Sequence, residues 1–308
     1  MKQSLRARLA VPGCENPRSM HSPYATAPAN PPALQHSAFY RFTPLPDPAA
    51  AAAQVRALAQ GLLGAIIVAA EGINGAVAGP LAAVQAFEAA LQSADIQHGA
   101  FAGMAFKHSG VHTAPFGRLK VLVKPEIVAL GLPDPAPGAG PLPPPDEADA
   151  SHVTPHDWRQ LLGRDDVVML DNRNHFEVRL GRFKGAADPG VQRFSDFVDY
   201  VNAQAPSWRA QGKTVAMYCT GGVRCDKTAP WLRSLGLPVL QLQGGILNHF
   251  AQLPDAHCDW DGECFVFDKR IALDTRLHET PTTAEDVFDA GDPGEAWRLA
   301  RAKRLDAF

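Results

Sequence analysis

The sequence predicts a chain of mixed α/β architecture with two consecutive domains and a short C-terminal extension. Its 308 residues exceed the length that a single hydrophobic core usually covers. In both halves, apolar strand-like runs alternate with helical stretches, of which the first, over 49–61, is rich in Ala, Leu and Gln. Between the halves lies a stretch rich in Pro, Gly and Ala, which is typical of an extended linker. We therefore divide the chain into a first domain over residues 37–125, a linker over 126–150, a second domain over 151–255 and an extension over 256–308.

The composition is that of a globular protein, with 46% hydrophobic and 20% charged residues. A formal net charge of −3 argues against a protein that coats nucleic acid without specificity, but it is compatible with a local basic surface. The longest apolar run, residues 61–70, is far shorter than the roughly 20 residues that span a bilayer, and no signal-peptide core follows the basic start. Five cysteines, an odd number, indicate working thiols in a reducing compartment. We expect a cytoplasmic protein without membrane contact or a stable protein partner.

The first 36 residues are predicted to be a disordered extension. They combine little periodic hydrophobicity with six prolines, Pro12, Pro17, Pro23, Pro28, Pro31 and Pro32. Met20 lies inside this segment and is an alternative start of the protein. Order is expected to begin at Ser37, where alternating apolar and polar residues indicate a strand.

The first domain is predicted to have the strand-helix-strand-strand-helix-strand order of a ferredoxin-like α+β fold. Pro48 is well placed at the start of the first helix, and glycines punctuate the turn and strand that begin at Gly72. The expected elements are a strand over 37–42, a helix over 49–61, strands over 65–69 and 72–79, a helix over 80–92, and strands over 103–107 and 119–123.

The second domain is predicted to be a parallel sheet with helices on both faces, because short apolar strands alternate with helices. Thr154 is placed to cap a first helix, with Pro155 at its first position. The expected later elements are strands over 167–171, 214–219 and 239–242 and helices over 194–204 and 224–235. Sites in such sheets form beyond the carboxyl ends of the strands, where Asp171 and Cys219 both lie.

A short loop at the end of the second of these strands carries the strongest chemical signal. It joins Cys219 to Arg224 through Thr220, Gly221, Gly222 and Val223. The glycines allow successive backbone N–H groups to turn inward as an anion-binding nest, and the following helix adds its positive end. With Arg224 as a cation, this setting favours the thiolate, so we expect Cys219 to act as a nucleophile near neutral pH. The alternative, a buried structural cysteine before an ordinary turn, explains neither the glycine pair nor the arginine.

Several neighbours are candidates for supporting roles in this site. Cys225 either resolves an oxidised or sulfur-loaded Cys219 or is a small residue packed beneath the loop. Asp171 either orients the loop or a substrate hydroxyl, or it caps local backbone or pairs with Arg173. Arg173 and Glu177 are expected to belong to an ion pair around the site.

Four segments of the chain carry a more specific pattern. They are residues 70–75 (AEGING), 170–177 (LDNRNHFE), 217–227 (MYCTGGVRCDK) and 262–270 (GECFVFDKR). Together they resemble the bacterial rhodanese-domain tRNA uridine hydroxylases, over roughly Ser37 to Leu273. The resemblance implies an acylphosphatase-like first domain, a rhodanese-like second domain, and oxygen-dependent hydroxylation of the wobble uridine of tRNA to 5-hydroxyuridine. It also implies that Cys219 is the essential cysteine, that tRNA is the partner and that molecular oxygen is a co-substrate.

Two departures from the family pattern limit what the resemblance implies. Many members end with two cysteine pairs of metal-ligand type, whereas no cysteine follows Cys264 here. Cys258 and Cys264 also lack the spacing of a zinc site, so we expect no bound metal. Arg182 stands where rhodanese domains usually carry His, which leaves the role of that position open. No flavin, haem or iron signature is visible, so the sequence identifies no cofactor.

Two other functions are compatible with the loop. A sulfurtransferase would carry a persulfide on Cys219, and the same cradle suits any sulfur anion. A noncatalytic module would use the cradle to hold an anion or RNA, although the retained cysteine and arginine argue against that role. The additional first domain, with its segment from Glu71 to Asn74, favours the hydroxylase.

A tRNA needs a wider surface than one loop, so we expect RNA to contact both domains. Glu71 and Asn74 either bind RNA, contact the second domain or form a structural turn. The basic stretch over 297–304 either contacts phosphates or is a solvated helix. Positive residues near the active-site segments are further candidates for phosphate contacts: Arg173, Arg179, Arg182, Lys184, Arg193, Lys227, Lys269 and Arg270.

Overall fold

A computed structural model of the protein describes residues 33–132 and 149–306. These residues all fall within one compact unit, Pro32–Phe308. Residues 1–32 of the predicted extension over 1–36 lie outside the described residues, whereas residues 33–36 are described. The first strand begins at Leu34, three residues before the predicted start of order at Ser37, because Leu34 already pairs with Val111 of a neighbouring strand.

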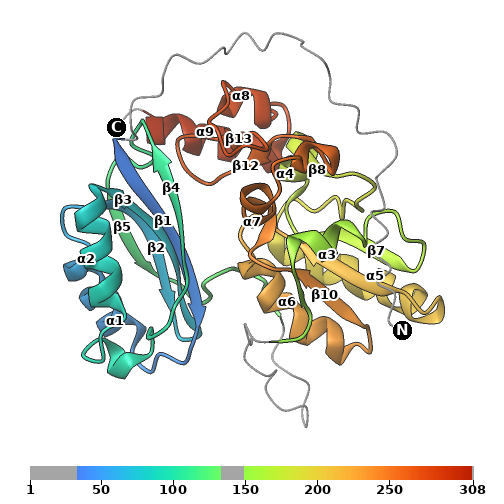
Figure 1. Cartoon of the computed structure of the whole chain (residues 1–308), viewed down its shortest axis with the longest axis horizontal. Helices are drawn as coiled ribbons and strands as arrows, with labels where there is room; N and C mark the ends of the chain where they lie inside the picture. The colour runs from blue at the N-terminus through green and yellow to red at the C-terminus, as the bar shows by residue number, and fades with distance from the viewer. Residues whose placement is uncertain (1–32, 133–148, 307–308) are drawn as a thin grey trace, which may run out of the picture. The chain divides into compact units, whose positions relative to one another are not determined.

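The first domain is an antiparallel-rich sheet with two helices. Its strands and α-helices in chain order are β1 (Leu34–Phe42), α1 (Pro48–Leu58), β2 (Leu63–Ala69), β3 (Gly72–Gly79), α2 (Leu81–Leu91), β4 (Phe106–Val111) and β5 (Leu119–Val123). The sheet has the order β4-β1-β3-β2-β5, and only β2 and β5 pair in parallel. Both helices lie against one face of the sheet (Figure 1). This arrangement confirms the predicted α+β fold class.

One predicted strand lies elsewhere, since β4 covers Phe106–Val111 and not residues 103–107. Gly103 adopts a φ of +71°, a left-handed conformation that suits a turn. The neighbouring side chains of Phe101 and Met104 are buried in the core of the domain instead of alternating between two faces. The chain enters the sheet only at Phe106, which pairs with Phe39 of β1.

The second domain is a parallel sheet in the order β6-β10-β9-β7. Its main elements are β6 (His152–Val153), α3 (Pro155–Arg159), β7 (Val167–Asp171), α4 (His175–Leu180), α5 (Phe197–Ala210), β9 (Thr214–Tyr218), α6 (Val223–Ser234), β10 (Val239–Leu242) and α7 (Gly245–Gln252). Helix α3 begins as predicted, because Thr154 Oγ1 accepts a hydrogen bond from the N–H of Asp157 at 3.2 Å and Pro155 follows the cap.

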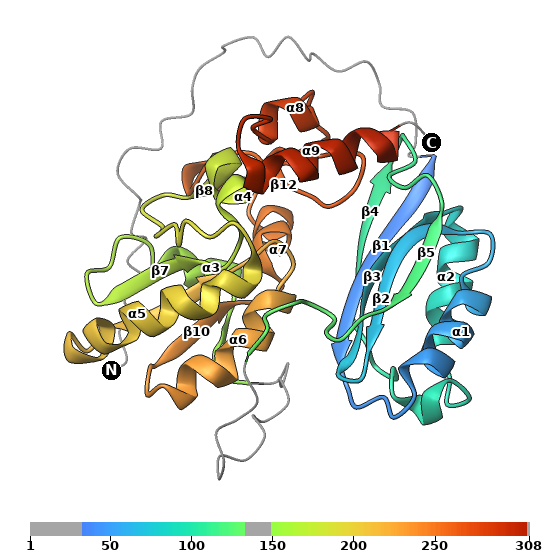
Figure 2. The same ribbon diagram turned by 180° about the vertical axis from the view of Figure 1, so that it is seen from behind.

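The central strand β9 shows why helices cover both faces of this sheet. Val215 and Met217 pack in one core with side chains of α5 and α6, whereas Ala216 and Tyr218 pack in another with side chains of α3 and α7. Alternate residues of a strand point to opposite faces, so the apolar strand is buried on both sides. Figure 2 shows the helices α3, α5, α6 and α7 beside strands β7 and β10 of this sheet. The predicted parallel sheet with two covered faces is confirmed.

The start of the predicted linker is part of the packed structure. Leu130 is fully buried in the same core as Phe197 of α5, and Ile127 is also buried. Apolar side chains at the start of the predicted linker over 126–150 therefore pack in the structure, while the domain bounds themselves stay a prediction. Residues 133–148 lie outside the described residues.

The C-terminal extension is folded onto the second domain as far as it is described. Its elements are β11 (Trp260–Gly262), which pairs with β8 (Gly181–Phe183), then β12 (Cys264–Phe265), β13 (Ala272–Leu273), α8 (Ala284–Val287) and α9 (Pro293–Asp306). Phe265, Val287 and Leu299 pack in one core with Phe176 of α4. Within residues 33–132 and 149–306, no helix is long and apolar enough to cross a membrane.

Candidate active site

Cys219 directly follows β9 and is buried in the loop that leads into α6. The backbone N–H of Gly222 donates to its sulfur over a distance of 3.1 Å. Gly222 has a φ of +103°, which an L side chain rarely adopts, and a Cβ there would lie 2.8 Å from the Tyr40 hydroxyl. Val223 is the first residue of α6, so the loop ends at the positive end of that helix. The predicted strand, glycine turn and helix are therefore present.

The surroundings of Cys219 stabilise its sulfur as a thiolate anion. Burial by itself would raise the pKa of the thiol. That effect is outweighed by the hydrogen bond from the Cys225 thiol, by the positive charge of Arg224 and by the backbone N–H groups of both residues, which lower the pKa of Cys219 to about 5. The thiolate is thus the dominant form at neutral pH.

Arg224 is held by Glu177, a residue for which the sequence suggests Arg173 as the partner. Its two Nη atoms donate to the carboxylate of Glu177 at 2.7 and 2.8 Å, and both side chains are buried. The expected pairing of Arg173 with Glu177 is wrong, because α4 places Glu177 opposite Arg224. Arg224 also donates to Thr220 Oγ1 at 3.4 Å. The cation beside Cys219 is therefore fixed in position and largely compensated by one carboxylate.

Asp171 and Arg173 form a separate ion pair in the interior. Arg173 donates through Nε and Nη2 to Asp171 at 2.8 and 2.6 Å, and Nη2 also reaches the carbonyl oxygen of Gly181 at 2.6 Å. Neither side chain is exposed. This geometry favours the structural alternative for Asp171, a link between the end of β7 and β8. It also removes Arg173 from the candidates for phosphate contact.

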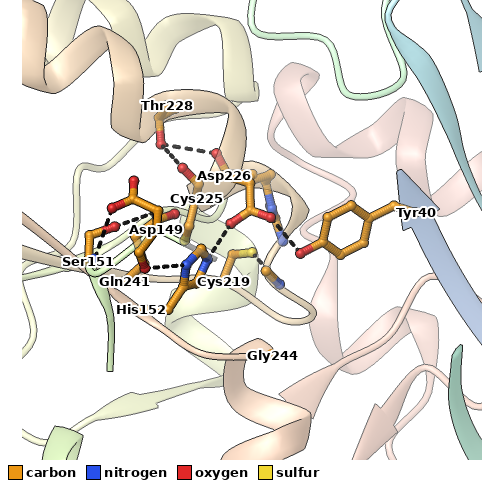
Figure 3. Close-up of polar contacts among 12 residues, drawn as sticks. Tyr40, Asp149, Ser151, His152, Cys219, Cys225, Asp226, Thr228, Gln241 and Gly244 are labelled. Carbon is orange, nitrogen blue, oxygen red and sulfur yellow. Dashed lines mark hydrogen bonds and ion pairs between the residues drawn. The ribbon is translucent and has the colours of Figure 1, made fainter. Parts of the chain in front are cut away.

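Cys225 lies in the first turn of α6, near Cys219 (Figure 3). Burial raises the pKa of the Cys225 thiol well above its ordinary value, and its hydrogen bond to Cys219 raises it further. The amide of Asn172 also reaches its sulfur, at 3.9 Å. Cys225 is therefore the protonated partner of the Cys219 thiolate. A buried pair of one thiolate and one thiol is an arrangement suited to redox chemistry.

The first domain supplies one residue to α6 and one to the loop, and the sequence singled out neither. The Tyr40 hydroxyl donates to Asp226 of α6 at 2.7 Å (Figure 3). The Nζ atom of Lys107 donates to the carbonyl oxygens of Gly221 and, at 3.1 Å, of Gly244. No signal in the sequence finds these residues, because they stand alone in strands more than 100 positions from the loop.

The segment from Glu71 to Asn74 contacts the second domain and the chain leading to it. The carboxylate of Glu71 accepts from Lys227 of α6 at 2.7 and 2.8 Å and from the N–H of Ile127 at 2.7 Å. The amide of Asn74 donates to the carbonyl oxygen of Ile127 at 3.0 Å. Among the alternatives for this segment, these contacts favour attachment to the second domain.

Only part of the predicted positive surface is available for RNA. Lys227 is paired with Glu71, and the buried side chain of Arg270 donates to Asp268 at 2.6 and 2.8 Å. Other candidates have exposed side chains, namely Arg182, Lys184 and Arg193. Near the loop, the ring of Phe267 is 62% exposed, and its centroid lies 5.9 Å from the Arg224 guanidinium. The sequence alone does not indicate this exposed ring.

The described residues contain no group of three or more His, Cys, Asp or Glu side chains that could hold a metal ion. Burial raises the pKa of the Cys264 thiol to about 12, so this cysteine is not prepared to be a thiolate ligand.

Comparison with known proteins identifies the family. Residues 34–127 match a family model described as the UPF0176 acylphosphatase like domain. A tRNA uridine(34) hydroxylase of Nitrobacter winogradskyi is 44% identical over 259 residues, which are 83% of this chain and 97% of that protein. The protein of the same name from Synechococcus elongatus is 44% identical over 79% of this chain and 86% of its own. One from Deinococcus radiodurans is 40% identical over 79% and 77%, respectively. The chain therefore belongs to the tRNA uridine(34) hydroxylase family.

Proposed function

We propose that this protein hydroxylates C5 of uridine 34, the wobble uridine of tRNA, with molecular oxygen as co-substrate and Cys219 as nucleophile. The observation that carries the proposal is the similarity to the relative from Nitrobacter winogradskyi. This similarity covers 97% of that protein and 83% of this chain, so it includes both domains. The site supports it independently, because a buried thiolate beside a fixed arginine is a nucleophile for an electron-poor ring carbon.

The first half of the reaction would use Cys219 alone. Its thiolate adds to C6 of the uracil ring, which breaks the C5–C6 double bond and leaves an enolate with negative charge at C5. This carbon then bonds to one atom of molecular oxygen, and protonation gives a C5 hydroperoxide. The thiolate is present for this step at neutral pH because its pKa is lowered to about 5.

The second half requires two electrons, which the Cys225 thiol, hydrogen-bonded to Cys219, would supply together with Cys219. The thiol of Cys225 reduces the hydroperoxide to a C5 hydroxyl and becomes a sulfenic acid. Loss of the C5 proton then expels Cys219 and forms 5-hydroxyuridine. Finally, Cys219 condenses with the sulfenic acid to a disulfide and releases water. The sum is uridine, oxygen and two thiols giving 5-hydroxyuridine, water and one disulfide, which an external thiol reductant restores.

Recognition of the RNA would combine the exposed positive side chains with the Phe267 ring. Proteins that read unpaired RNA stack bases on exposed aromatic rings, and the anticodon loop offers unpaired bases. Phe267 packs edge to face on Phe265, with ring centroids 5.0 Å apart, and Phe265 is buried. The exposed ring therefore has a rigid support close to Arg224.

The test is mass spectrometry of nucleosides from tRNA of a strain that lacks this gene. Loss of 5-hydroxyuridine derivatives, restored by the intact gene but not by Cys219→Ser, would support the proposal. Normal levels of the modified nucleoside in the deletion strain would refute it. An unchanged tRNA together with thiosulfate-to-cyanide sulfur transfer by the purified protein would instead support the sulfurtransferase, whose persulfide the same loop would stabilise. The absence of both activities would support a binding module.

A further inference from the structure

The loop after Cys219 presents its N–H groups inward only if its carbonyl groups point outward, and each outward carbonyl has a donor. The N–H of Ile246 donates to the carbonyl oxygen of Cys219 at 3.0 Å, and the N–H of Leu247 donates to that of Thr220 at 3.2 Å. Both donors belong to the first turn of α7. The third carbonyl, that of Gly221, is held by the Nζ atom of Lys107.

We propose that Lys107 is a positioning residue for the active-site loop, because by holding the Gly221 carbonyl it aims the N–H of Gly222 at the sulfur of Cys219. The two groups belong to one trans peptide unit, in which the C=O and the N–H point in opposite directions. The N–H of Gly222 lies 3.1 Å from the sulfur on one side, and Lys107 binds the carbonyl oxygen on the other side.

This peptide unit needs an external lock because it joins two glycines. Glycine tolerates many backbone conformations, so the unit can turn over at little cost. Turned over, it would direct the partial negative charge of the Gly221 oxygen at the thiolate. An ammonium group on the oxygen opposes that rotation. It also polarises the peptide and strengthens the hydrogen bond on its other side.

Lys107 is itself held in place by the first domain. Lys107 lies on β4 opposite Ala38 of β1. Its Nζ atom is 5.5 Å from the centroid of the Tyr40 ring, which also belongs to β1. The same Nζ atom donates to the Gly244 carbonyl at 3.1 Å, just before α7. Lys107 therefore connects the cysteine loop to the residue that precedes α7. The other two carbonyl groups of the loop are bound by N–H groups of α7, so the donors of all three carbonyls are linked to one another.

The proposed role rests on Cys219 being the nucleophile, but its test does not require tRNA. The charged and titratable groups around the sulfur are Arg224 and Cys225 of α6, with Glu177 of α4 paired to Arg224. In this proposal Lys107 acts on the sulfur through the peptide whose carbonyl oxygen it binds. Its removal should therefore change the titration of Cys219 while the Arg224–Glu177 pair stays in place.

The experiment is a titration of thiolate absorbance in the full-length protein, with the Cys219→Ser variant as the blank. In Lys107→Met, the pKa of Cys219 should rise by about one unit, the effect expected for weakening one hydrogen bond to an anion. Lys107→Arg, which keeps the charge and donors, should restore most of the shift. Because an unfolded variant would be uninformative, each protein is checked by circular dichroism, and Lys107→Leu, which also lacks a donor, replaces Lys107→Met if the latter does not fold.

Two matched controls separate positioning from a general effect. Asn74→Ala removes a hydrogen bond between the first domain and the chain that leads to the second domain, and Lys120→Met removes a positive charge from β5. Both should leave the Cys219 titration nearly unchanged. A folded Lys107→Met variant that titrates like the unaltered protein would overturn the inference, as would an equal shift in Asn74→Ala. If the titration shifts as expected but tRNA stays unmodified, the proposed function fails and the positioning role stands.

Discussion

The guanidinium of Arg224 donates both of its Nη atoms to the carboxylate of Glu177, at 2.7 and 2.8 Å, and the pair is buried beside Cys219. Burial alone would raise the pKa of Glu177, but Arg224 holds it below its ordinary value. The pair thus supplies an oriented cation to the loop while most of its charge is compensated. Its two members come from α6 and α4, so it also joins the active-site loop to the segment after β7.

Replacement of Arg224 should therefore destabilise the fold as well as the thiolate. Arg224→Ala leaves the carboxylate of Glu177 buried without its partner, and such changes typically cost about 3–5 kcal/mol. Urea unfolding followed by circular dichroism measures the loss. As a control, Arg164→Ala breaks an ion pair with Asp166 that is more than half exposed and should leave the unfolding midpoint nearly unchanged. Equal stability of Arg224→Ala and the unaltered protein would show that the buried pair contributes nothing.

Hydroxylation should depend on pH through the thiol of Cys219. Because the pKa of this acid is lowered to about 5, the reactive thiolate persists above that pH and is lost as the pH falls through it. An ordinary cysteine would lose its thiolate below about 8.5. Thiolate absorbance, measured against Cys219→Ser, should show a midpoint near the lower value, and single-turnover rates at acidic pH should follow the same curve. A midpoint equal to that of a free cysteine would contradict the account of the loop.

The variants Cys219→Ser and Cys225→Ser should have different effects on the formation of 5-hydroxyuridine. The first removes the nucleophile and should abolish 5-hydroxyuridine formation. The second removes the proposed reducing thiol, so turnover should fall without vanishing when an external thiol is supplied. Cys225→Ala, which unlike Ser leaves no side-chain hydrogen-bond donor, should raise the pKa of Cys219, because the Cys225 hydrogen bond lowers it. Peptide mass spectrometry of the unaltered enzyme after turnover without reductant should find a Cys219–Cys225 disulfide, and its absence would exclude this pair as the electron source.

Phe267→Ala should weaken binding of an RNA hairpin with the anticodon loop sequence. Loss of one base stacked on an aromatic ring corresponds to a roughly 5- to 150-fold weaker affinity. Phe267→Trp should retain binding, and a fluorescent 2-aminopurine in the loop should be quenched only by the aromatic variants. Leu81→Ala changes a side chain of similar exposure, 55%, on α2 and serves as the control. Unchanged affinity of Phe267→Ala would exclude the stacking contact.

Removal of metal ions should affect neither folding nor activity. This expectation follows from the absence of cysteine pairs after Cys264 and from the high pKa of that thiol. Elemental analysis of the purified protein and assays after exhaustive dialysis against a chelator test it. One tightly held zinc ion per chain, or activity that returns only with added metal, would contradict the prediction.

Much of the fold and the core of the site could be predicted from local sequence. The alternation of apolar runs and helical stretches predicts both sheets, because burial imposes periods of 2 and 3.6 residues on the chain. The order of Cys219, the glycine pair and Arg224 predicts the nest, because its donors are backbone groups of consecutive residues. The sequence predicts a strand over 103–107, whereas the strand lies at Phe106–Val111. The difference arises because Gly103 and its buried neighbours form a turn without such a period.

Only the tertiary structure decided which partners complete the site. The sequence offered Arg173 for Glu177, but the backbone path after β7 turns Arg173 toward Asp171 and Glu177 toward Arg224. Lys107 reaches the Gly221 carbonyl from 114 positions away, and no periodicity or spacing marks it. The nest depends on local backbone geometry, so the sequence of neighbouring residues is enough to predict it. The direction of its peptides depends on donors from other elements, which meet the loop only after both domains have folded.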